Sequence, residues 1–259
     1  MIRGLYTSGW SMMANSKKMD VISNNLANVN TNAYKKDTVI FESFPNVLTR
    51  RLNDFRSNSD PSGAIGTMEL GHDVGEIFTY RTQGQLVKTS SSLDLAIKDS
   101  ENAYFTVSVP GQNGALTEYY TRDGAFTTNS LNELVTKEGY AVMGEDGPVV
   151  LNGPDFSVDA DVYILQDGEA LGRLRITQFQ DGTTLRKYGA NLSQAMPQSV
   201  QVPFTGVVEQ GFIEQSNVNI IKEMVDMISV MRSYEANQKV LQAQDSTLEK
   251  AVTEVGALR

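Results

Sequence analysis

The residues that could carry out chemistry in this chain are few and form no recognisable active-site motif. Its single histidine, His72, lies in the glycine-rich stretch LGHDVG, where a surface role is commoner than a catalytic or metal-binding one. The sequence has no cysteine, which excludes a disulfide framework, a thiolate metal site and a cysteine nucleophile. It also lacks the patterns of zinc proteases, serine hydrolases, Walker loops and dinucleotide-binding turns. We therefore expect no metal, no cofactor and no enzyme activity.

A loose group of carboxylates offers the remaining chemistry. It lies in VDADVYILQDGE and contains Asp159, Asp161, Asp167 and Glu169. The segment lacks the glycine and the ligand spacing of a calcium loop, so a solvated acidic turn is the simpler interpretation. Because a carboxylate pair for glycoside hydrolysis needs only proximity in space, a secreted β-rich hydrolase or carbohydrate-binding module stays open as an alternative. Its functional residues would lie around Asp94, Asp123 or Asp159.

The composition is that of a globular protein, with 40% hydrophobic and 20% charged residues. No apolar run approaches the roughly 18 residues of a membrane-spanning helix, so we expect no membrane insertion. The first residues, MIRGLYTSGWSMM, lack the apolar core and cleavage site of a signal peptide. A chain without cysteine suits a reducing cytosol, and it also suits export in an unfolded state.

The net charge of −9 argues against nucleic-acid binding, and its distribution is uneven. Residues 1–56 carry eight basic and four acidic side chains, whereas residues 57–208 carry nine and nineteen. A solvated acidic surface is the simplest interpretation, and attraction between differently charged parts is the alternative. The pairs Lys17-Lys18 and Lys35-Lys36 are interpreted as solvated faces.

A seven-residue repeat runs through the first 27 residues. Large side chains form one column, and the positions three before them are mostly small: the columns are Leu5, Met12, Met19, Leu26 and Ile2, Gly9, Ser16, Ser23. This pattern predicts a helix that a second helix can approach closely. The asparagine-rich run SNNLANVNTNAYK (23–35) predicts its end near Ala27, because asparagine accepts the left-handed cap conformation.

The last 40 residues repeat the pattern over a longer span. One column holds Met224, Met231, Gln238, Asp245 and Val252, and the other holds Met227, Tyr234, Leu241, Leu248 and Val255. The spacing predicts a long helix with Asn217 or Asn219 as its N-cap. We interpret the methionines of the seam as core, since methionine packs adaptably against different neighbours.

Two arrangements of these helices stay open. They could pair as an intramolecular hairpin on a central domain, or they could become ordered only on self-assembly with other copies. A lone pair of helices buries little apolar surface for the number of residues it orders, which favours further helices from neighbouring subunits.

The middle of the chain predicts a β domain. Short alternating runs at 93–97, 104–109, 162–166 and 173–179 are separated by turn pairs such as Glu138-Gly139 and Asp146-Gly147. Residues 43–52 could form one short helix, and residues 57–66 are a loop by composition. We therefore predict an α+β fold: heptad helices at both ends in a coiled-coil-like layer, and a central antiparallel all-β domain. The expected parts are 1–36, an irregular arm 37–84, the β domain 85–206, and 207–259.

The segment MDVISNNLANVNTNAYK (19–35) resembles the N-terminal signature of flagellar basal-body rod and hook proteins. Further resemblances follow in the same order along the chain, at 82–97, 120–126, 134–142 and 211–251. The residues that match the family pattern are Asn24, Asn25, Leu26, Ala27, Asn28, Asn30, Thr31, Tyr34 and Lys35, then Ser216, Asn217, Val218 and Asn219. Rod proteins of the distal or proximal type are the better match, and a hook-type axial subunit of the same family is the alternative.

The resemblance implies a structural subunit of the flagellar rod. Such a subunit is exported from the cytoplasm by the flagellar type III apparatus without a cleaved signal, and it polymerises helically into a hollow drive shaft that carries torque from motor to hook. It implies contacts with other copies and with other rod and hook proteins. The terminal helices would line the inner tube, in the part of the basal body that spans the periplasm or cell wall, through the large side chains of the columns named above.

One position departs from the family pattern. The family usually has glycine before the aromatic residue, but this chain has Ala33 before Tyr34. If the position needs a positive φ, alanine is strained there. We expect either a different turn or an unusual conformation at Asn32 instead.

Overall fold

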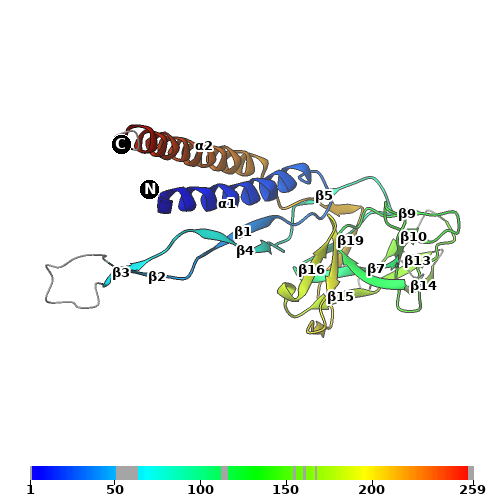
Figure 1. Cartoon of the computed structure of the whole chain (residues 1–259). Coiled ribbons are helices and arrows are strands. Elements are labelled where there is room, and N and C mark those ends of the chain that lie inside the picture. Colours follow the sequence, from blue (N-terminus) through cyan, green and yellow to red (C-terminus); the bar gives the residue numbers. More distant parts are fainter. Residues whose placement is uncertain are drawn as a thin grey trace. The chain divides into compact units, whose positions relative to one another are not determined.

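The structure is a computed structural model that describes residues 2–50, 64–111, 116–153, 156–159, 162–166 and 168–255. The chain divides into two compact units (Figure 1). The terminal unit comprises Met1–Leu26, Asp37–Phe78 and Ile220–Arg259, and the central unit comprises Ala27–Lys36 and Thr79–Asn219. The N-terminal helix, the C-terminal helix and the strand-rich middle make this an α+β protein, as predicted.

The terminal unit contains two long helices, α1 (Ile2–Ala27) and α2 (Ile220–Lys250), and a π-helical turn follows α2 at Ala251–Val255. They run antiparallel: Gly4 lies against the side chain of Gln244 near one end, and the amide of Asn25 donates to Glu223 at the other end. The residue numbers of both pairs sum to the same value, so the register is regular along the hairpin. The single chain therefore has the intramolecular pairing, and the predicted helix end at Ala27 is confirmed.

Four strands of the terminal unit connect the helices through the arm. Strand β1 (Asp37–Ser43) pairs with β4 (His72–Thr79), and β2 (Val47–Arg50) pairs antiparallel with β3 (Ala64–Met68). The short helix expected at 43–52 is therefore wrong over its described residues. Pro45 lacks a backbone N–H and disfavours helix at Phe44, which favours extended chain at this point.

The loop expected at 57–66 is only partly testable. Residues 51–63 lie outside the described part of the chain, and the last three residues of the expected loop belong to β3.

The central unit is built from short antiparallel strands. Their bounds are β5 (Leu86–Lys88), β6 (Leu95–Lys98), β7 (Ala103–Pro110), β8 (Leu116–Thr121), β9 (Thr127–Thr128), β10 (Leu134–Val135), β11 (Ala141–Val142), β12 (Ser157–Val158), β13 (Tyr163–Gln166), β14 (Glu169–Arg173), β15 (Ile176–Phe179), β16 (Leu185–Tyr188), β17 (Leu192–Ala195), β18 (Gln201–Val202), β19 (Val207–Gln210) and β20 (Phe212–Glu214), with a 3-10 turn at Gly182–Thr184.

The largest sheet has the order β16-β17-β8-β7-β11-β10-β9, and β15 joins it through β7. A three-stranded sheet has the order β12-β13-β14. Two further pairs, β19-β6 and β20-β5, bring residues 207–214 onto strands that lie more than a hundred positions earlier. The stretch just before α2 is therefore part of the central unit.

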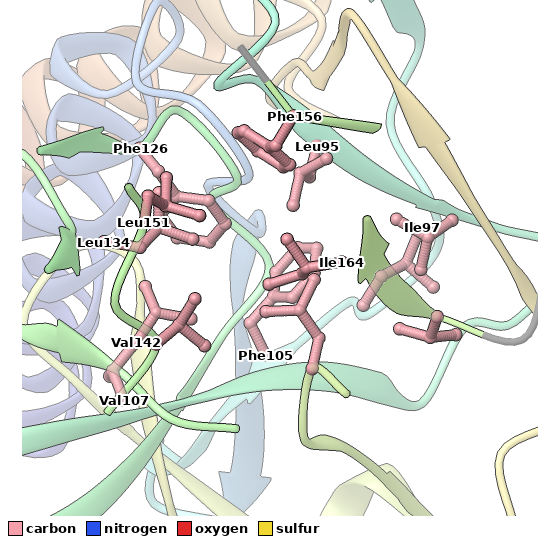
Figure 2. Close-up of a cluster of buried hydrophobic side chains, with 14 of the residues drawn as sticks. Leu95, Ile97, Phe105, Val107, Phe126, Leu134, Val142, Leu151, Phe156 and Ile164 are labelled. Carbon is pink, nitrogen blue, oxygen red and sulfur yellow. The ribbon is translucent and has the colours of Figure 1, made fainter. Parts of the chain in front are cut away.

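A large apolar cluster fills the space between these sheets (Figure 2), and a smaller one gathers Tyr104, Tyr120, Phe179 and Leu185. Phe105 and Val107 of β7 point toward Leu134 of β10 and Val142 of β11, and Ile164 of β13 lies among them; all five are fully or almost fully buried. Side chains alternate along β7, with Phe105 and Val107 in this cluster and Tyr104 in a second one. The predicted strand is confirmed, and both of its faces are buried. Gly139 and Gly147 are the second residues of two predicted turn pairs, and both adopt positive φ, at 88° and 136°.

Candidate assembly surface

The two heptad columns of α2 differ in burial. Met227, Tyr234, Leu241 and Leu248 are half-buried. Met224, Met231 and Val252 of the other column are 48%, 47% and 72% exposed, and Gln238 and Asp245 are exposed as well. The side chain of Val255 lies outside the described part of the chain. The interpretation of Met224 and Met231 as core is therefore wrong for the single chain, because α1 covers only one side of α2.

The column of α1 is half-buried along its whole length, at Leu5, Met12, Met19 and Leu26. An open apolar groove runs between the two helices. Leu5 and Met12 line it from α1, Tyr234 and Leu241 line it from α2, and the small residues Gly9 and Ser16 lie along it. The structure thus brings together large residues from both predicted helices, with small residues beside them as the sequence pattern indicated.

Exposed apolar side chains gather in the terminal unit. Among the described residues, 17 of the 26 large hydrophobic side chains that are exposed belong to it, although it is the smaller unit. They are Tyr6, Met13, Ile40, Phe41, Val47, Leu48, Met68, Ile77, Phe78, Ile220, Ile221, Met224, Val225, Ile228, Met231, Val240 and Val252. Its fully buried hydrophobic residues among those described are only Ala14, Ile22 and Val230. An exposed apolar surface of this extent is typical of an interaction site.

The start of α2 continues this surface as a stripe. Ile221, Val225 and Ile228 are 76%, 59% and 53% exposed, and their spacing of four and three residues places them on one helix face. Met224 and Met231 lie beside them. A solvent-facing helix usually presents charged and polar residues on its outer face, so this apolar stripe is a candidate contact surface.

Asn25 of the N-terminal signature connects three segments of the terminal unit by hydrogen bonds. Its amide nitrogen donates to the carbonyl oxygen of Asp37 at 2.7 Å and to Oε2 of Glu223 at 3.1 Å. Its amide oxygen accepts from the backbone N–H of Asp37 at 3.0 Å. Asn25 and Glu223 are both buried. The side-chain amide supplies two N–H donors and one acceptor oxygen at once, which suits asparagine here: one side chain fixes the end of α1, the start of β1 and the first turn of α2.

The rest of the asparagine-rich run makes the turn into the central unit. Thr31 donates to Asn28 twice, from N–H to the carbonyl oxygen at 3.1 Å and from Oγ1 to Oδ1 at 3.2 Å. Leu26 is half-buried, and Asn24, Ala27 and Asn30 are exposed. The turn is held by one local backbone bond and one local side-chain bond between Asn28 and Thr31, residue types that readily bond within turns.

Ala33 itself adopts the left-handed conformation, with φ of 56°, and it is 3% exposed. Its N–H donates to the carbonyl oxygen of Glu214 at 2.8 Å. The expectation that the turn differs, or that Asn32 takes the unusual conformation, is therefore wrong. The glycine-type geometry is kept although alanine occupies the position, because the bond to the β20 backbone fixes it.

Behind this turn lies a buried ionic group that sequence reasoning missed. Glu214 is 1% exposed, and it accepts from Lys35 Nζ at 2.5 Å, from the N–H of Gly84 at 2.8 Å and from Arg122 Nη1 at 3.1 Å. Lys35 also donates to the carbonyl oxygen of Thr82. The interpretation of Lys35 as part of a solvated face is wrong. Burial lowers the pKa of Lys35, and the neighbouring Glu214 carboxylate opposes that change.

The C-terminal part of the signature meets the N-terminal part in the central unit. Asn217 Oδ1 accepts from the N–H of Lys36 at 2.8 Å, and its Nδ2 donates to the carbonyl oxygens of Tyr80 and Thr82. The N–H of Asn217 donates to the carbonyl oxygen of Tyr34, a buried residue. Asn217 therefore connects the segment before β1 to the segment between β4 and β5, and it is not the helix cap.

The remaining residues of this signature lie directly before α2. The N–H of Val218 donates to Oγ of Ser216 at 3.2 Å, and Val218 is buried. Asn219 immediately precedes Ile220, so of the two predicted N-caps it holds the N-cap position.

His72 and the acidic residues considered as candidates for chemistry make ordinary structural contacts or are exposed. His72 packs edge-on against Phe41, with ring centroids 5.2 Å apart. Asp94 accepts from the hydroxyl of Thr89, and Asp123 accepts from the N–H of Ala125 and from Asn191. Asp159 is exposed, Glu169 is the first residue of β14, and Asp161 and Asp167 lie outside the described residues.

Over the described part of the chain, no three His, Cys, Asp or Glu residues are grouped as metal ligands. No helix there is long and apolar enough to cross a membrane.

Comparisons with known proteins agree with the geometry. Three families match: "Flagella basal body rod protein" over residues 5–35, "Flagellar hook protein FlgE/F/G D1 domain" over 100–210, and "Flagellar basal body rod FlgEFG protein C-terminal" over 209–254. The flagellar basal-body rod protein FlgG of Buchnera aphidicola subsp. Acyrthosiphon pisum is 34% identical, over 96% of this chain and 98% of the relative. The flagellar basal-body rod protein FlgF of Rhizobium meliloti is 33% identical, over 99% of both chains. The flagellar hook-basal body complex protein FlhO of Bacillus subtilis is 28% identical, over the full length of both.

The matched families place the chain in the class of flagellar rod and hook proteins. Within that class, the chain belongs to the flagellar basal-body rod protein family, and it is a structural subunit of the rod.

Proposed function

We propose that this subunit polymerises helically through its terminal helices into a hollow shaft that transmits torque from motor to hook. The single observation that carries the proposal is the exposed column of α2, in which Met224, Met231 and Val252 are 48%, 47% and 72% exposed. A repeated apolar stripe on a long helix is stabilised when a second helix packs into it. In a polymer, the second helix comes from the next copy.

The proposal assigns a place to each part of the chain. Residues 1–36 and 207–259 form the inner, coiled-coil-like layer of the tube, and the central β domain, residues 85–206, faces outward. The arm, residues 37–84, packs between neighbouring copies, which would cover its exposed Val47, Leu48, Ile77 and Phe78. The partners are other copies of this chain and other rod and hook proteins.

The route to this place is export by the flagellar type III apparatus, without a cleaved signal peptide, into the part of the basal body that spans the periplasm or cell wall. The role is mechanical and not enzymatic, and it needs no nucleic acid and no insertion into a membrane. The absence of cysteine supports this route, because no disulfide opposes passage of an unfolded chain.

Substitution of an exposed seam residue tests the proposal. Met231→Asp places a charge in the stripe without removing any buried contact, so the monomer should fold normally and fail to polymerise. Sedimentation and electron microscopy under polymerising conditions measure the loss, and swimming in soft agar measures it in a strain that lacks the wild-type subunit.

The matched control is Leu131→Asp, which changes an exposed side chain of the central unit, 69% exposed. It should polymerise as the wild type does. Normal rods from the Met231→Asp variant would contradict the proposal.

A further inference from the structure

The methionines of this chain are concentrated in the terminal unit. Eight of the ten belong to its segments, although it is the smaller unit. Among the described residues, the methionines with exposed side chains all belong to it, and they are Met13, Met68, Met224 and Met231. Exposed thioether groups therefore gather in the unit that carries the candidate assembly surface.

Two of these methionines lie in line on α2. Met224 and Met231 are seven residues apart, which is two helical turns, so their side chains lie on the same face of the helix. Both are about half exposed, and both belong to the exposed heptad column. Met227 lies between them in sequence but belongs to the other column and is half-buried. One short stretch of helix thus contains two accessible thioethers and one shielded one.

The thioether is the side chain here that peroxides oxidise most readily, because the sequence contains no cysteine. The sulfur lone pair attacks one oxygen of hydrogen peroxide, the O–O bond breaks, and an S–O bond forms. The sulfur loses two electrons, and the departing hydroxide takes the proton of the transferred oxygen and leaves as water. The product is methionine sulfoxide, whose polar oxygen replaces a lone pair of an apolar side chain.

This oxygen has different consequences in the single chain and in an assembly. In the single chain the oxidised side chains of Met224 and Met231 can keep their oxygens in water, so the fold should tolerate them. Against an apolar face of a neighbouring helix, the oxygen needs a hydrogen-bond donor. The N–H groups inside a helix already donate within that helix, so burial of the oxygen there is unfavourable.

We propose that Met224 and Met231 form a redox-sensitive modification site, at which oxidation by peroxide keeps the subunit from assembling. The proposal rests on the proposed function, in which the exposed column of α2 packs against a neighbouring copy. It makes the unassembled subunit sensitive to oxidants and the polymer resistant, because packing covers both thioethers. Methionine sulfoxide reductases reverse the block: two thiols are oxidised to a disulfide, and the sulfoxide oxygen leaves as water.

Mass spectrometry of the peroxide-treated monomer tests the site itself. Trypsin cleaves after Lys222 and Arg232, and the peptide between them, EMVDMISVMR, contains all three methionines of this stretch. Met224 and Met231 should oxidise about threefold or more faster than Met227, because exposure controls the access of peroxide. Circular dichroism should show that the oxidised monomer stays folded. Equal rates at the three positions would overturn the proposal whether or not the protein polymerises.

Sedimentation under polymerising conditions tests the consequence. After peroxide treatment and its removal by catalase, the concentration needed for polymerisation should rise at least about tenfold, which corresponds to about 1.4 kcal/mol per subunit. Treatment with methionine sulfoxide reductases of both stereospecificities should restore the original value. Rods that are assembled first and then treated should show little oxidation at Met224 and Met231.

Two double variants locate the effect. Met224→Leu with Met231→Leu keeps the apolar volume, so it should polymerise before and after peroxide treatment. The matched control, Met13→Leu with Met68→Leu, removes the other exposed methionines and should stay sensitive.

Four results would overturn the proposal: polymerisation of the oxidised wild type at its original concentration, an unchanged block in the Met224→Leu, Met231→Leu variant, loss of the block in the control variant, or rapid oxidation of both methionines in assembled rods. A reduced wild type that does not polymerise at any concentration would contradict the proposed function as well.

Discussion

At the residue scale, Ala33 adopts a left-handed backbone conformation that its Cβ atom disfavours. A left-handed φ costs an alanine about 1–2 kcal/mol relative to the right-handed region, and the structure keeps it through the bond from its N–H to Glu214. Replacement by glycine removes the strain but adds freedom to the unfolded chain. The sequence alone identified the position as unusual, but not which residue of the turn takes the positive φ.

We predict that Ala33→Gly raises the free energy of unfolding of the central unit by about 0.5–1 kcal/mol. Denaturant unfolding measures the change. The same substitution at Ala96, which is buried in β6 with an ordinary backbone, should destabilise the unit. A loss of stability in Ala33→Gly would show that the turn does not strain the alanine.

Asn25 holds three segments through one amide, so its loss should be costly. Asn25→Leu keeps the size but leaves the N–H and the carbonyl of Asp37 without this partner. We expect the terminal unit to lose about 2–4 kcal/mol of stability. Hydrogen exchange in the first turn of α2 reports the loss, and the control Ser23→Ala, at an exposed residue of α1, should stay within about 0.5 kcal/mol of wild type. Unchanged exchange in Asn25→Leu would refute the role of the amide.

Asp123 makes the stability of the central unit depend on pH. Burial raises the pKa of this carboxyl above its ordinary value of 3.8, and the N–H of Ala125 and the amide of Asn191 oppose the rise. Between 3.8 and the raised pKa, the folded state binds more protons than the unfolded state, so the contribution of Asp123 to stability falls as the pH rises through this window.

The stability of the wild type relative to Asp123→Asn should therefore be higher at pH 3.5 than at pH 7. Denaturant titrations of both proteins at the two pH values measure this difference. A difference that is independent of pH, or larger at pH 7, would contradict the effect of burial.

At the element scale, the ends of the helices follow from local sequence, and the sequence predicted them well. The asparagine run ends α1 at Ala27, and α2 begins directly after Asn219. The alternating run from Tyr104 to Val109 became part of β7, where successive side chains point to opposite faces and both faces are buried. These signals are short-range, so one sequence is enough to show them.

The arm was harder to predict because its strands are short and their partners are distant. Strand β2 (Val47–Arg50) pairs with β3 (Ala64–Met68), which begins 14 residues after β2 ends. The residues of β2 carry no pattern that identifies β3 as the strand it pairs with. The ionic group around Glu214 was missed for the same reason. Lys35, Arg122 and Glu214 lie far apart in sequence, and single charged residues carry no periodic signal.

The hairpin of α1 and α2 should depend on the half-buried column of α2. Leu241→Asp places a charge in the apolar groove between the helices and should cost the terminal unit about 2 kcal/mol or more. Hydrogen exchange should then quicken in both helices, while the amides of β7 and β11 stay protected. Faster exchange in the central strands as well would show that the two units do not unfold separately.

At the scale of the whole molecule, the two units differ in what they bury. The central unit encloses a continuous core around Phe105 and Ile164. The terminal unit has few buried hydrophobic residues and many exposed ones, although its helices are already paired in the single chain. Pairing within one copy thus half-buries one column of α2 and leaves the other exposed.

Electron cryomicroscopy of the polymer formed by the purified wild-type protein tests this account most directly. We predict a hollow tube whose inner wall consists of α1 and α2, with Met224, Met231 and Val252 buried against helices of adjacent copies. A tube whose inner wall is made of the central strands, or one in which these three side chains still face solvent, would contradict the account.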